Sequence, residues 1–287
     1  METIIGLGSA GCNIADCFAR YPQYKIYKLD AGIYGKNCYY LPELNTPEEY
    51  EAHIGDLTNV FGEISGDILF VVGGSGNVSG GALRALEQLR HCSINVLYIE
   101  PDIGLLSGDR KLQERMTYYV LQEYTRSGLF ERLFLVSNPQ LEKILGDVPI
   151  MGYNDKLNNL LVSTVHMINV YNNIEPVVSN FSDFKEQTRI STIGLSSLEN
   201  EKKLFFSLDG MREMRYYYAI NRDKLETDGT LMRKITENVK NEADIDVSYG
   251  VYATDYADDY VYCVANASMI QFRENEKKTL QINENTV

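Results

Sequence analysis

Two glycine-rich segments contain the residue types and spacings that could support chemistry. The first, IIGLGSAGCNIADCF at residues 4–18, places Gly6, Gly8 and Gly11 in the pattern G-x-G-x-x-G between a β-branched run and a helical pattern. Such glycines let a backbone turn approach a phosphate at the N-terminus of a helix. Asp30 follows Gly11 by nineteen residues, at the end of the next expected strand, where an acid would accept a hydrogen bond from a ribose 2′-hydroxyl. Taken alone, the pattern predicts an NAD(P) site.

The second segment, GGSGNVSGG at residues 73–81, predicts a second phosphate loop. It contains five glycines, two serines and one asparagine, and it lies between an apolar strand-like run at residues 67–72 and a helical pattern. A loop of small residues can turn several N–H groups toward one oxyanion. Two such loops at one edge of a sheet fit a polyphosphate bound from two sides, although the second could also be a plain tight turn.

Composition and charge argue against several classes of function. The 287 residues carry a net charge of −13 at pH 7, which repels a phosphate backbone, so we expect no direct nucleic-acid partner. Five cysteines without a C-x-x-C pair predict neither a zinc site nor a disulfide framework, and they fit a reducing cytosol. No signal peptide is evident, and no apolar run reaches the roughly eighteen residues of a membrane span. We therefore expect a cytoplasmic protein with no membrane partner.

Alternating strand-like and helical patterns predict an α/β fold with a doubly wound, mostly parallel sheet. The expected strands of the first half are residues 3–7, 24–30, 67–74, 94–102 and 131–139, and the expected helices are 13–20, 81–90 and 110–124. One long helix with an apolar stripe is expected at residues 155–170. A smaller α/β unit follows, with expected strands at 202–209, 212–220, 246–255 and 259–270 and an expected helix at 228–241.

Six segments resemble, in order, the nucleotide-contacting segments of the tubulin/FtsZ superfamily. GLGSAGCNIAD resembles the first phosphate loop, KLDAG the second loop, and GGSGNVSGG the tubulin signature loop G-G-G-T-G-[ST]-G. YIEPD occupies the place of the proline-containing loop over the ribose, and LVSNPQL that of the segment whose Asn contacts the nucleotide. GYNDKLNNLL resembles the start of the long central helix. The resemblance covers roughly residues 1–183 and is looser in the later strands.

The resemblance implies that the bound nucleotide is GTP or GDP, with Mg²⁺. Asp155 would hydrogen-bond the guanine, and Tyr153 or Met151 would pack against it. The residues that the resemblance places at the nucleotide are Gly8, Ser9, Ala10, Gly11, Cys12, Asn13, Asp30, Gly74, Ser75, Gly76, Asn77, Val78, Ser79, Gly80, Pro101, Arg110, Asn138, Tyr153 and Asp155. The chain departs from the family pattern in several places. The signature loop lacks the usual Thr, and LSGDRK offers Ser107 with Arg110 or Lys111 where the family often has Glu followed by a basic residue.

In this superfamily a loop from the next subunit of a filament completes the active site, and PVVSNFSDFKE at residues 176–186 is the matching loop. Asp183 matches the catalytic acid, which polarises the water that attacks the γ-phosphate. Asn180 stands where the family usually has an aspartate, so it brings no charge, and hydrolysis could be slow. Both residues could instead cap a helix.

The resemblance therefore implies a GTPase that assembles head-to-tail with itself into dynamic filaments. Its parts would be a GTP-binding domain at residues 1–150, a central helix at 151–179, and an activation and assembly domain at 180–287 with a short tail from residue 273. The compact chain, its start directly on a strand and the divergent signature loop look like phage- or plasmid-encoded tubulins, which position DNA or phage assemblies. Two alternatives stay open: a tubulin-like nucleotide-binding protein that neither hydrolyses nor polymerises, and an NAD(P)-dependent Rossmann oxidoreductase.

The remaining nucleophilic or metal-ligating residue types are expected to be structural. The three histidines are scattered and form no triad or metal set. Cys12 is expected to pack rather than react, and the carboxylates of YATDYADDY fit a solvated turn between two strands.

Overall fold

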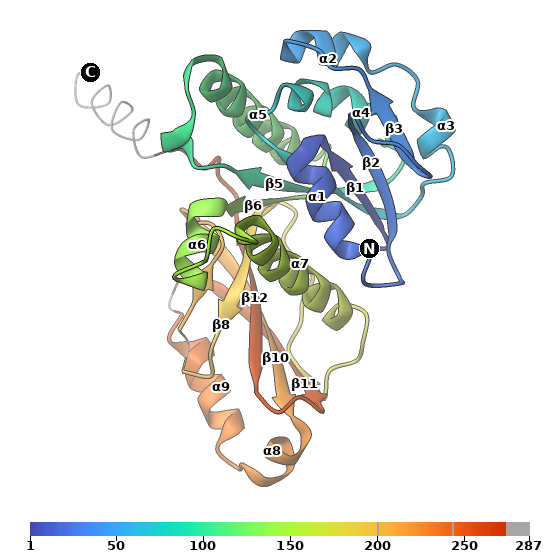
Figure 1. The fold of residues 1–287 in the computed structure, drawn as a ribbon. Coiled ribbons are helices and arrows are strands. Elements are labelled where there is room, and N and C mark those ends of the chain that lie inside the picture. Colours follow the sequence, from blue (N-terminus) through green and yellow to red (C-terminus); the bar gives the residue numbers. More distant parts are fainter. Residues whose placement is uncertain (200, 243, 274–287) are drawn as a thin grey trace, which may run out of the picture.

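One continuous sheet runs through the protein (Figure 1). The computed structural model describes residues 1–199, 201–242 and 244–273. The strand order is β3-β2-β1-β4-β5-β6-β8-β12-β10-β11-β7, and β9 pairs with β8 beside this path. The first six strands of this path are parallel to their neighbours, as the doubly wound pattern predicts.

The first half of the sheet follows the predicted alternation of strands and helices. Its strands are β1 (Thr3–Leu7), β2 (Lys25–Ala31), β3 (Cys38–Leu41), β4 (Asp67–Gly73), β5 (Ser93–Glu100) and β6 (Arg132–Ser137). Its helical segments are α1 (Gly8–Phe18), α2 (Pro47–His53), α3 (Thr58–Phe61), η1 (Asn77–Gly81), α4 (Ala82–Gln88), η2 (Ile103–Leu105), α5 (Gly108–Arg126) and α6 (Asn138–Leu145).

The second half is a mixed sheet covered by helices on its two faces. Its strands are β7 (Val178–Ser179), β8 (Ile190–Ser196), β9 (Lys203–Leu204), β10 (Met211–Asn221), β11 (Asp246–Thr254) and β12 (Tyr260–Ala267). Its helices are α8 (Arg222–Thr227) and α9 (Leu231–Lys240), and α7 (Tyr153–Tyr171) precedes it. The two halves of the sheet join where Leu133 and Phe134 of β6 pair with Ile190 and Ser191 of β8. The expected domain boundaries near residues 150 and 180 stay a proposal.

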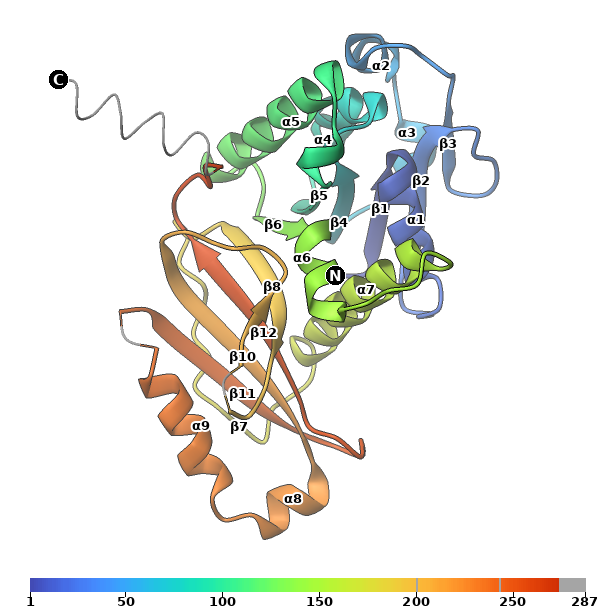
Figure 2. The same ribbon diagram turned by 60° about the vertical axis from the view of Figure 1, so that its left-hand side comes forward.

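Two apolar cores cover the two faces of the sheet. Strand residues alternate between them: on β1, Ile4 enters the core beneath α1 and α7, whereas Ile5 and Leu7 enter the core beneath α4 and α5. Such burial on both faces explains why the central strands are continuous apolar runs in the sequence. Figure 2 shows α1 and α7 on one face and α4 and α5 on the other.

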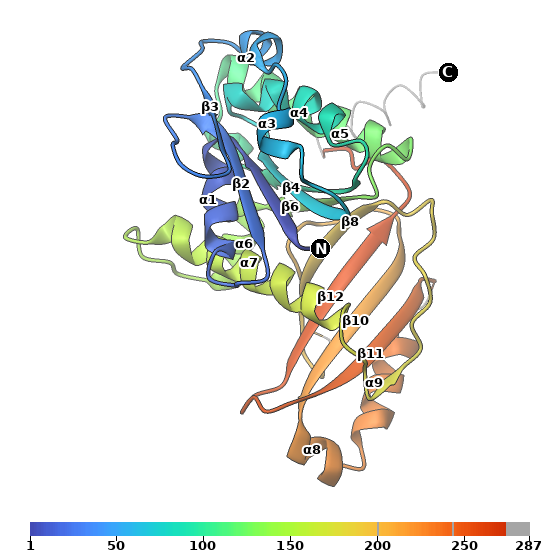
Figure 3. The same ribbon diagram turned by 90° about the vertical axis from the view of Figure 1, so that its right-hand side faces the viewer.

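The long helix α7 lies between the two halves of the molecule (Figure 3). Its buried residues recur at helical spacing and include Leu157, Leu161 and Val165, which share one core with Phe18 of α1. At the C-terminal end of α7, the centre of the Tyr171 ring lies 4.5 Å from the centre of the Tyr252 ring of β11. One apolar stripe therefore packs against both halves.

Two expectations about secondary structure are wrong, and one alternative is excluded. The first helix begins at Gly8, not at Asn13, because Gly8 has a φ of +69° and turns the chain from β1 directly into α1. Of the expected strand 202–209, only Lys203 and Leu204 form a strand beside β8. Phe205 still donates its N–H to the Ile193 carbonyl of β8 at 2.9 Å, and its side chain enters the apolar core. No helix begins at Asn180 or Asp183, so neither residue is a helix cap.

Of the remaining elements, one expected turn is confirmed, one strand is unexpected, and the expected tail cannot be compared. Residues 255–259 form the expected turn between β11 and β12. The strand β8 was not expected, because Ser191 and Thr192 make it polar in sequence, although both are fully buried. The expected tail lies outside the described residues after Arg273.

Candidate nucleotide site

The carboxyl ends of β1 and β4 form the topological switch point of the parallel sheet. From β1 the chain moves outward to β2 and β3, and it then returns to place β4 on the other side of β1. Ligands of doubly wound sheets bind in the crevice that such a reversal creates. Both glycine-rich segments lie here: one follows β1 and the other follows β4.

The first loop brings α1 unusually close to the sheet. A Cβ atom on Gly6 would overlap the carbonyl oxygen of Gly11, and a Cβ atom on Gly11 would overlap the carbonyl oxygen of Val71. Glycines at both positions therefore allow the helix to start against β1 and β4. No side chain caps the N-terminus of α1, and no acidic residue lies in its first turn. Its first N–H groups and its positive dipole end suit an anion.

The second loop touches the first. A Cβ atom on Gly8 would lie 3.5 Å from Cβ of Val78, and one on Gly73 would lie 3.2 Å from Cβ of Ala10. The short helical segment η1, which follows Gly76, has no side-chain cap either. The two loops therefore form one continuous lining, with two uncapped helical starts at the same edge of the sheet.

Polar side chains hold the second loop in shape. The Ser79 hydroxyl donates to the Gly76 carbonyl at 2.6 Å, and the Asn77 amide donates to the Asn45 carbonyl at 2.7 Å. These two side chains are used within the protein, and backbone N–H groups of the loop remain as donors for an anion. Arg110 lines the same groove of about 690 Å³ as Asn77 and Ser79.

Asp30 joins the first loop to the end of β2. Its carboxylate accepts a hydrogen bond from the Ser9 hydroxyl at 3.0 Å and another from the Ala31 N–H at 2.9 Å. Only 7% of the residue is exposed. In this arrangement Asp30 orients Ser9, and the oxidoreductase interpretation would need it to face a ribose instead.

The other expected nucleotide residues lie at the same edge of the sheet. Pro101 follows β5, Asn138 opens α6 after β6, and Tyr153 and Asp155 lie in the first turn of α7. Burial, and then the nearby Glu142 carboxylate, raise the pKa of Tyr153 above its ordinary value. Asn13 and Asp155 are exposed, as are Ser9 and Ala10. Exposed side chains, most of them polar, therefore lie at the same edge of the sheet as the two glycine loops.

Cys12 has the packing role expected for it. The thiol donates to the Gly6 carbonyl at 3.4 Å, and burial, with the Asp30 charge next, raises its pKa to about 12. His166 stacks on Tyr21 with a ring-centre distance of 3.6 Å, and burial lowers its pKa. Within the described part of the chain, no three His, Cys, Asp or Glu side chains come together as a metal site. No described helix is long and apolar enough to cross a membrane.

Asp183 lies at the opposite edge of the sheet from the glycine loops. The next residue, Phe184, packs under the Arg132 guanidinium, whose centre is 4.4 Å from the ring centre, and Arg132 is the first residue of β6. Phe184 also lines a cavity of about 290 Å³ with Asp67 and Asn95, near the amino ends of β4 and β5. A strand of seven residues, such as β4, spans about 20 Å. One chain therefore cannot bring Asp183 to its own glycine loops.

The loop that carries Asp183 is fixed by β10 and β11. The Asn180 N–H donates to the Tyr249 carbonyl at 3.0 Å, and the Asn180 side-chain oxygen accepts from the Tyr249 N–H at 2.6 Å. Arg215 of β10 donates to the Ser182 carbonyl. Asn180 thus extends an edge pairing, while the Asp183 side chain is exposed.

Comparison with solved structures identifies the architecture. CetZ1 from Haloferax volcanii, a GDP-bound monomer, has a TM-score of 0.71 at 17% identity, covering 100% of this chain and 99% of that one. TubZ from Bacillus thuringiensis serovar israelensis, in GDP-form protofilaments, has a TM-score of 0.69 at 17% identity, covering 99% and 92%. An empty FtsZ dimer of M. jannaschii has a TM-score of 0.66 at 13% identity, covering 92% and 87%. The chain has the tubulin/FtsZ fold. No protein-family model matches the sequence, and no curated protein matches it significantly.

The tubulin/FtsZ fold confirms the architecture that the sequence motifs predicted. Sequence reasoning missed residues that support the site from behind. Arg215 of β10 directly precedes three buried tyrosines, and this position in the sequence is the only local signal for it. Tyr98 and Glu114 lie behind the second loop and carry no local sequence signal.

Proposed function

We propose that the chain binds GTP and assembles head-to-tail with itself, and that two successive subunits share the site that hydrolyses GTP. The observation that carries the proposal is the separation of Asp183 from the glycine loops by about the length of a strand. Stacking one subunit on the next brings one edge of the sheet against the opposite edge of its neighbour. Such a stack is a heterologous contact that repeats without closing.

The two glycine loops support the nucleotide part of the proposal. Uncapped N–H groups at the starts of α1 and η1 suit the charge of a polyphosphate. Among the solved structures with this fold, TubZ occurs in GDP-form protofilaments and CetZ1 with GDP. Asp155 and Tyr153, in the first turn of α7, are the residues that we assign to the guanine.

Hydrolysis of GTP requires the protein mainly to position the attacking water and the phosphates. Asp183 of one subunit would accept a hydrogen bond from a water and align it with the γ-phosphorus of GTP in the next. The water oxygen bonds to phosphorus, the bond to the β-phosphate oxygen breaks, and the water protons pass to the phosphate products and solvent. Mg²⁺, bound with the nucleotide, would neutralise phosphate charge and take most of its ligands from phosphate oxygens and water. That mode fits a chain whose described residues contain no acidic metal cluster.

We further propose the phage- or plasmid-encoded branch, with filaments that position DNA or phage assemblies in a bacterial cytoplasm. A plasmid-segregation TubZ has the same fold, with a TM-score of 0.69 at 16% identity. The net charge of −13 supports contact with such cargo through another protein rather than through nucleic acid itself.

The first test is GTP turnover measured across protein concentrations, with light scattering recorded in parallel. A shared site requires turnover per molecule to rise from near zero together with scattering. Turnover independent of concentration would indicate a self-contained site and contradict the proposal. Binding of GTP without turnover at any concentration would favour the non-hydrolysing alternative, and binding of NAD alone would favour the oxidoreductase.

A complementation experiment tests the shared site directly. Asp183→Ala removes the acid from one edge, and Gly76→Asp places a negative charge in the second loop, where a Cβ atom meets nothing within 4 Å. Each variant alone should turn over little GTP, whereas a mixture should recover turnover because one subunit supplies the loop and its neighbour supplies Asp183. Gly76→Asn, which has the same shape without the charge, is the matched control. A mixture as inactive as its components would contradict the shared site.

A further inference from the structure

A buried tyrosine hydroxyl supports the second glycine loop from behind. Tyr98 of β5 is fully buried. A Cβ atom on Gly74 would overlap its hydroxyl oxygen, so the hydroxyl lies directly against the backbone of the loop. Burial, and then the Glu114 charge, raise the pKa of Tyr98 well above its ordinary value, so the hydroxyl stays protonated and acts as a donor. Its position therefore helps to set the position of Gly74.

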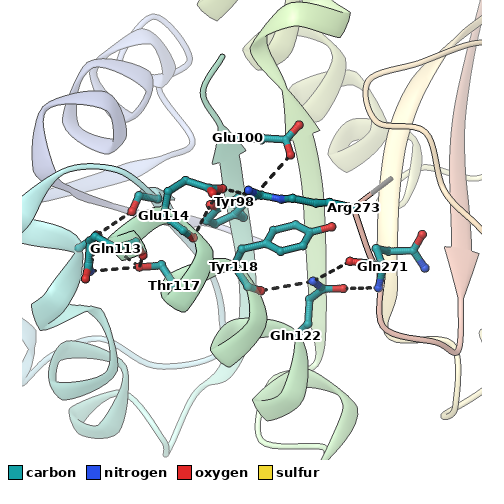
Figure 4. A network of polar contacts seen from close by, with 11 residues as sticks. Tyr98, Glu100, Gln113, Glu114, Thr117, Tyr118, Gln122, Gln271 and Arg273 are labelled. Atoms are coloured by element: carbon teal, nitrogen blue, oxygen red, sulfur yellow. Dashed lines mark hydrogen bonds and ion pairs between the residues drawn. The ribbon is translucent and has the colours of Figure 1, made fainter. Parts of the chain in front are cut away.

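The acceptor for this hydroxyl is a buried carboxylate on α5. Tyr98 donates to Oε1 of Glu114 at 2.6 Å, and the Glu114 side chain has no exposed surface (Figure 4). Among the described residues, Oε2 of Glu114 has no hydrogen-bond partner. A buried carboxylate with so few partners is costly unless a cation compensates it.

That cation comes from the far end of the described chain. Arg273 donates to the same Glu114 oxygen, and it lies 3.6 Å from the Glu100 carboxylate, next to Pro101. The Arg273 guanidinium centre also lies 4.6 Å from the centre of the Tyr118 ring of α5. Burial raises the pKa of Glu100. Arg273 thus lies between Glu100 and Glu114, behind the second glycine loop.

Backbone and amide hydrogen bonds hold the segment that carries Arg273. The Gln271 N–H donates to Oε1 of Gln122 at 2.7 Å, and the Gln271 side-chain oxygen accepts from the Asp209 N–H at 2.6 Å. Gln271 is 1% exposed. Residues 271–273 are therefore docked on α5, and Glu114 connects them to the loop.

The same helix contacts the other end of the loop. Gln113, next to Glu114, donates to the Ser79 hydroxyl at 3.1 Å and to the Thr117 hydroxyl at 3.2 Å. The helix α5 thus reaches the second loop both at Gly74, through Tyr98, and at Ser79. A shift of α5 would move both ends of the loop.

We propose that Glu114 and Tyr98 are positioning residues of the second glycine loop, and that Arg273 couples the docking of residues 271–273 to nucleotide binding at that loop. This inference rests on the proposed nucleotide site. Without Arg273, the buried Glu114 carboxylate loses its cation, reorients, and releases the hydroxyl that supports Gly74. Because coupling between two equilibria is reciprocal, a nucleotide that orders the loop also favours the docked position of residues 271–273.

The test measures the affinity for fluorescent GDP and the amide hydrogen exchange of peptides containing Gln271 and Arg273, below the concentration at which scattering rises. Tyr98→Phe and Arg273→Met should each weaken GDP binding about tenfold, and the double variant should lose little more because both act through one chain of contacts. Nucleotide should slow exchange at residues 271–273 in the wild type but not in Tyr98→Phe. A merely structural role would not remove that response.

Two further variants keep the outcome interpretable. Lys224→Met breaks an ion pair with Asp259 far from the site and should leave both readouts unchanged. Glu114→Gln keeps a carbonyl acceptor for Tyr98, so it should retain most of the GDP affinity while losing the response of residues 271–273 to nucleotide. The inference, but not the proposed function, would be overturned if Tyr98→Phe kept the wild-type GDP affinity or kept the exchange response of residues 271–273 to nucleotide. A wild type that binds no guanine nucleotide would overturn the proposed function and this inference together.

Discussion

The Arg215 guanidinium lies 3.7 Å from the centre of the Phe184 ring, and Phe184 directly follows Asp183. The same guanidinium lies 4.7 Å from the Phe181 ring and donates to the Ser182 carbonyl. One planar cation therefore holds the residues on both sides of Asp183. An arginine suits this position because its plane stacks on aromatic rings while its edge donates hydrogen bonds.

Replacing that arginine tests whether the loop must be rigid. Arg215→Lys keeps the charge but loses the planar stacking and the fork of donors, so Asp183 should sample more positions. We expect GTP turnover in assembled protein to fall about tenfold, while GDP affinity stays unchanged. Steady-state turnover above the assembly concentration, compared with fluorescent-GDP titration, provides the measurement. Arg212→Lys, on the same strand, is the matched control, and equal turnover in both variants would contradict the positioning role.

Removing the acid itself should separate binding from turnover. Asp183→Ala leaves the glycine loops untouched because Asp183 lies about a strand length away from them. We expect GDP affinity to be unchanged and turnover to fall about 10²- to 10⁴-fold, the usual range for a general acid–base group. The nearby exposed acid Glu186 offers the comparison Glu186→Ala, which should retain turnover. If Asp183→Ala turned over GTP at the wild-type rate, the assignment of Asp183 would fail.

The glycine spacing predicted the local geometry of the first loop because the interactions that it encodes are local. Gly6, Gly8 and Gly11 specify a strand that turns directly into a helix, and neighbouring elements then complete the crevice. The amphipathic stripe of α7 likewise predicted its length to within a few residues. A local backbone conformation can be predicted from the sequence when only one residue type, such as glycine, can adopt that conformation.

The residues that pack behind the glycine loops could not be predicted from local sequence patterns. Glu114 looks like an ordinary helix-surface acid in sequence, and it is buried only because Tyr98 and Arg273 meet it from distant segments. Asn180 looks like a substituted catalytic residue, and its pairing with Tyr249 becomes visible only once β11 is in place. Such roles depend on strand order and on the docking of residues 271–273, which are long-range properties.

The chemistry of Cys12 gives a prediction about pH. Because burial raises its folded pKa to about 12, the thiol stays protonated up to strongly alkaline pH. We expect iodoacetamide at pH 8.5 to alkylate the half-buried Cys17 readily and Cys12 very slowly, as mass spectrometry of labelled peptides would measure. In the unfolded chain the Cys12 thiol ionises near pH 8.5. The free energy of unfolding therefore includes the full contribution of the protonated thiol below that pH, and it loses this contribution as the pH rises toward 12. Labelling of Cys12 in the folded protein as fast as in urea would contradict this.

The contact between Gly74 and Tyr98 predicts a rescue. Gly74→Ala places a methyl group on the Tyr98 hydroxyl and should destabilise the fold by roughly 1–3 kcal/mol, because a packed core resists added volume. Gly76→Ala adds the same methyl group where no atom lies within 4 Å, so its unfolding midpoint should stay close to that of the wild type. Tyr98→Phe removes the obstructing oxygen, so the double variant should regain part of the stability that Gly74→Ala loses. Thermal denaturation of the wild type, Gly74→Ala, Tyr98→Phe and the double variant measures this cycle. Additive losses in the double variant would mean that the hydroxyl does not set the position of the loop.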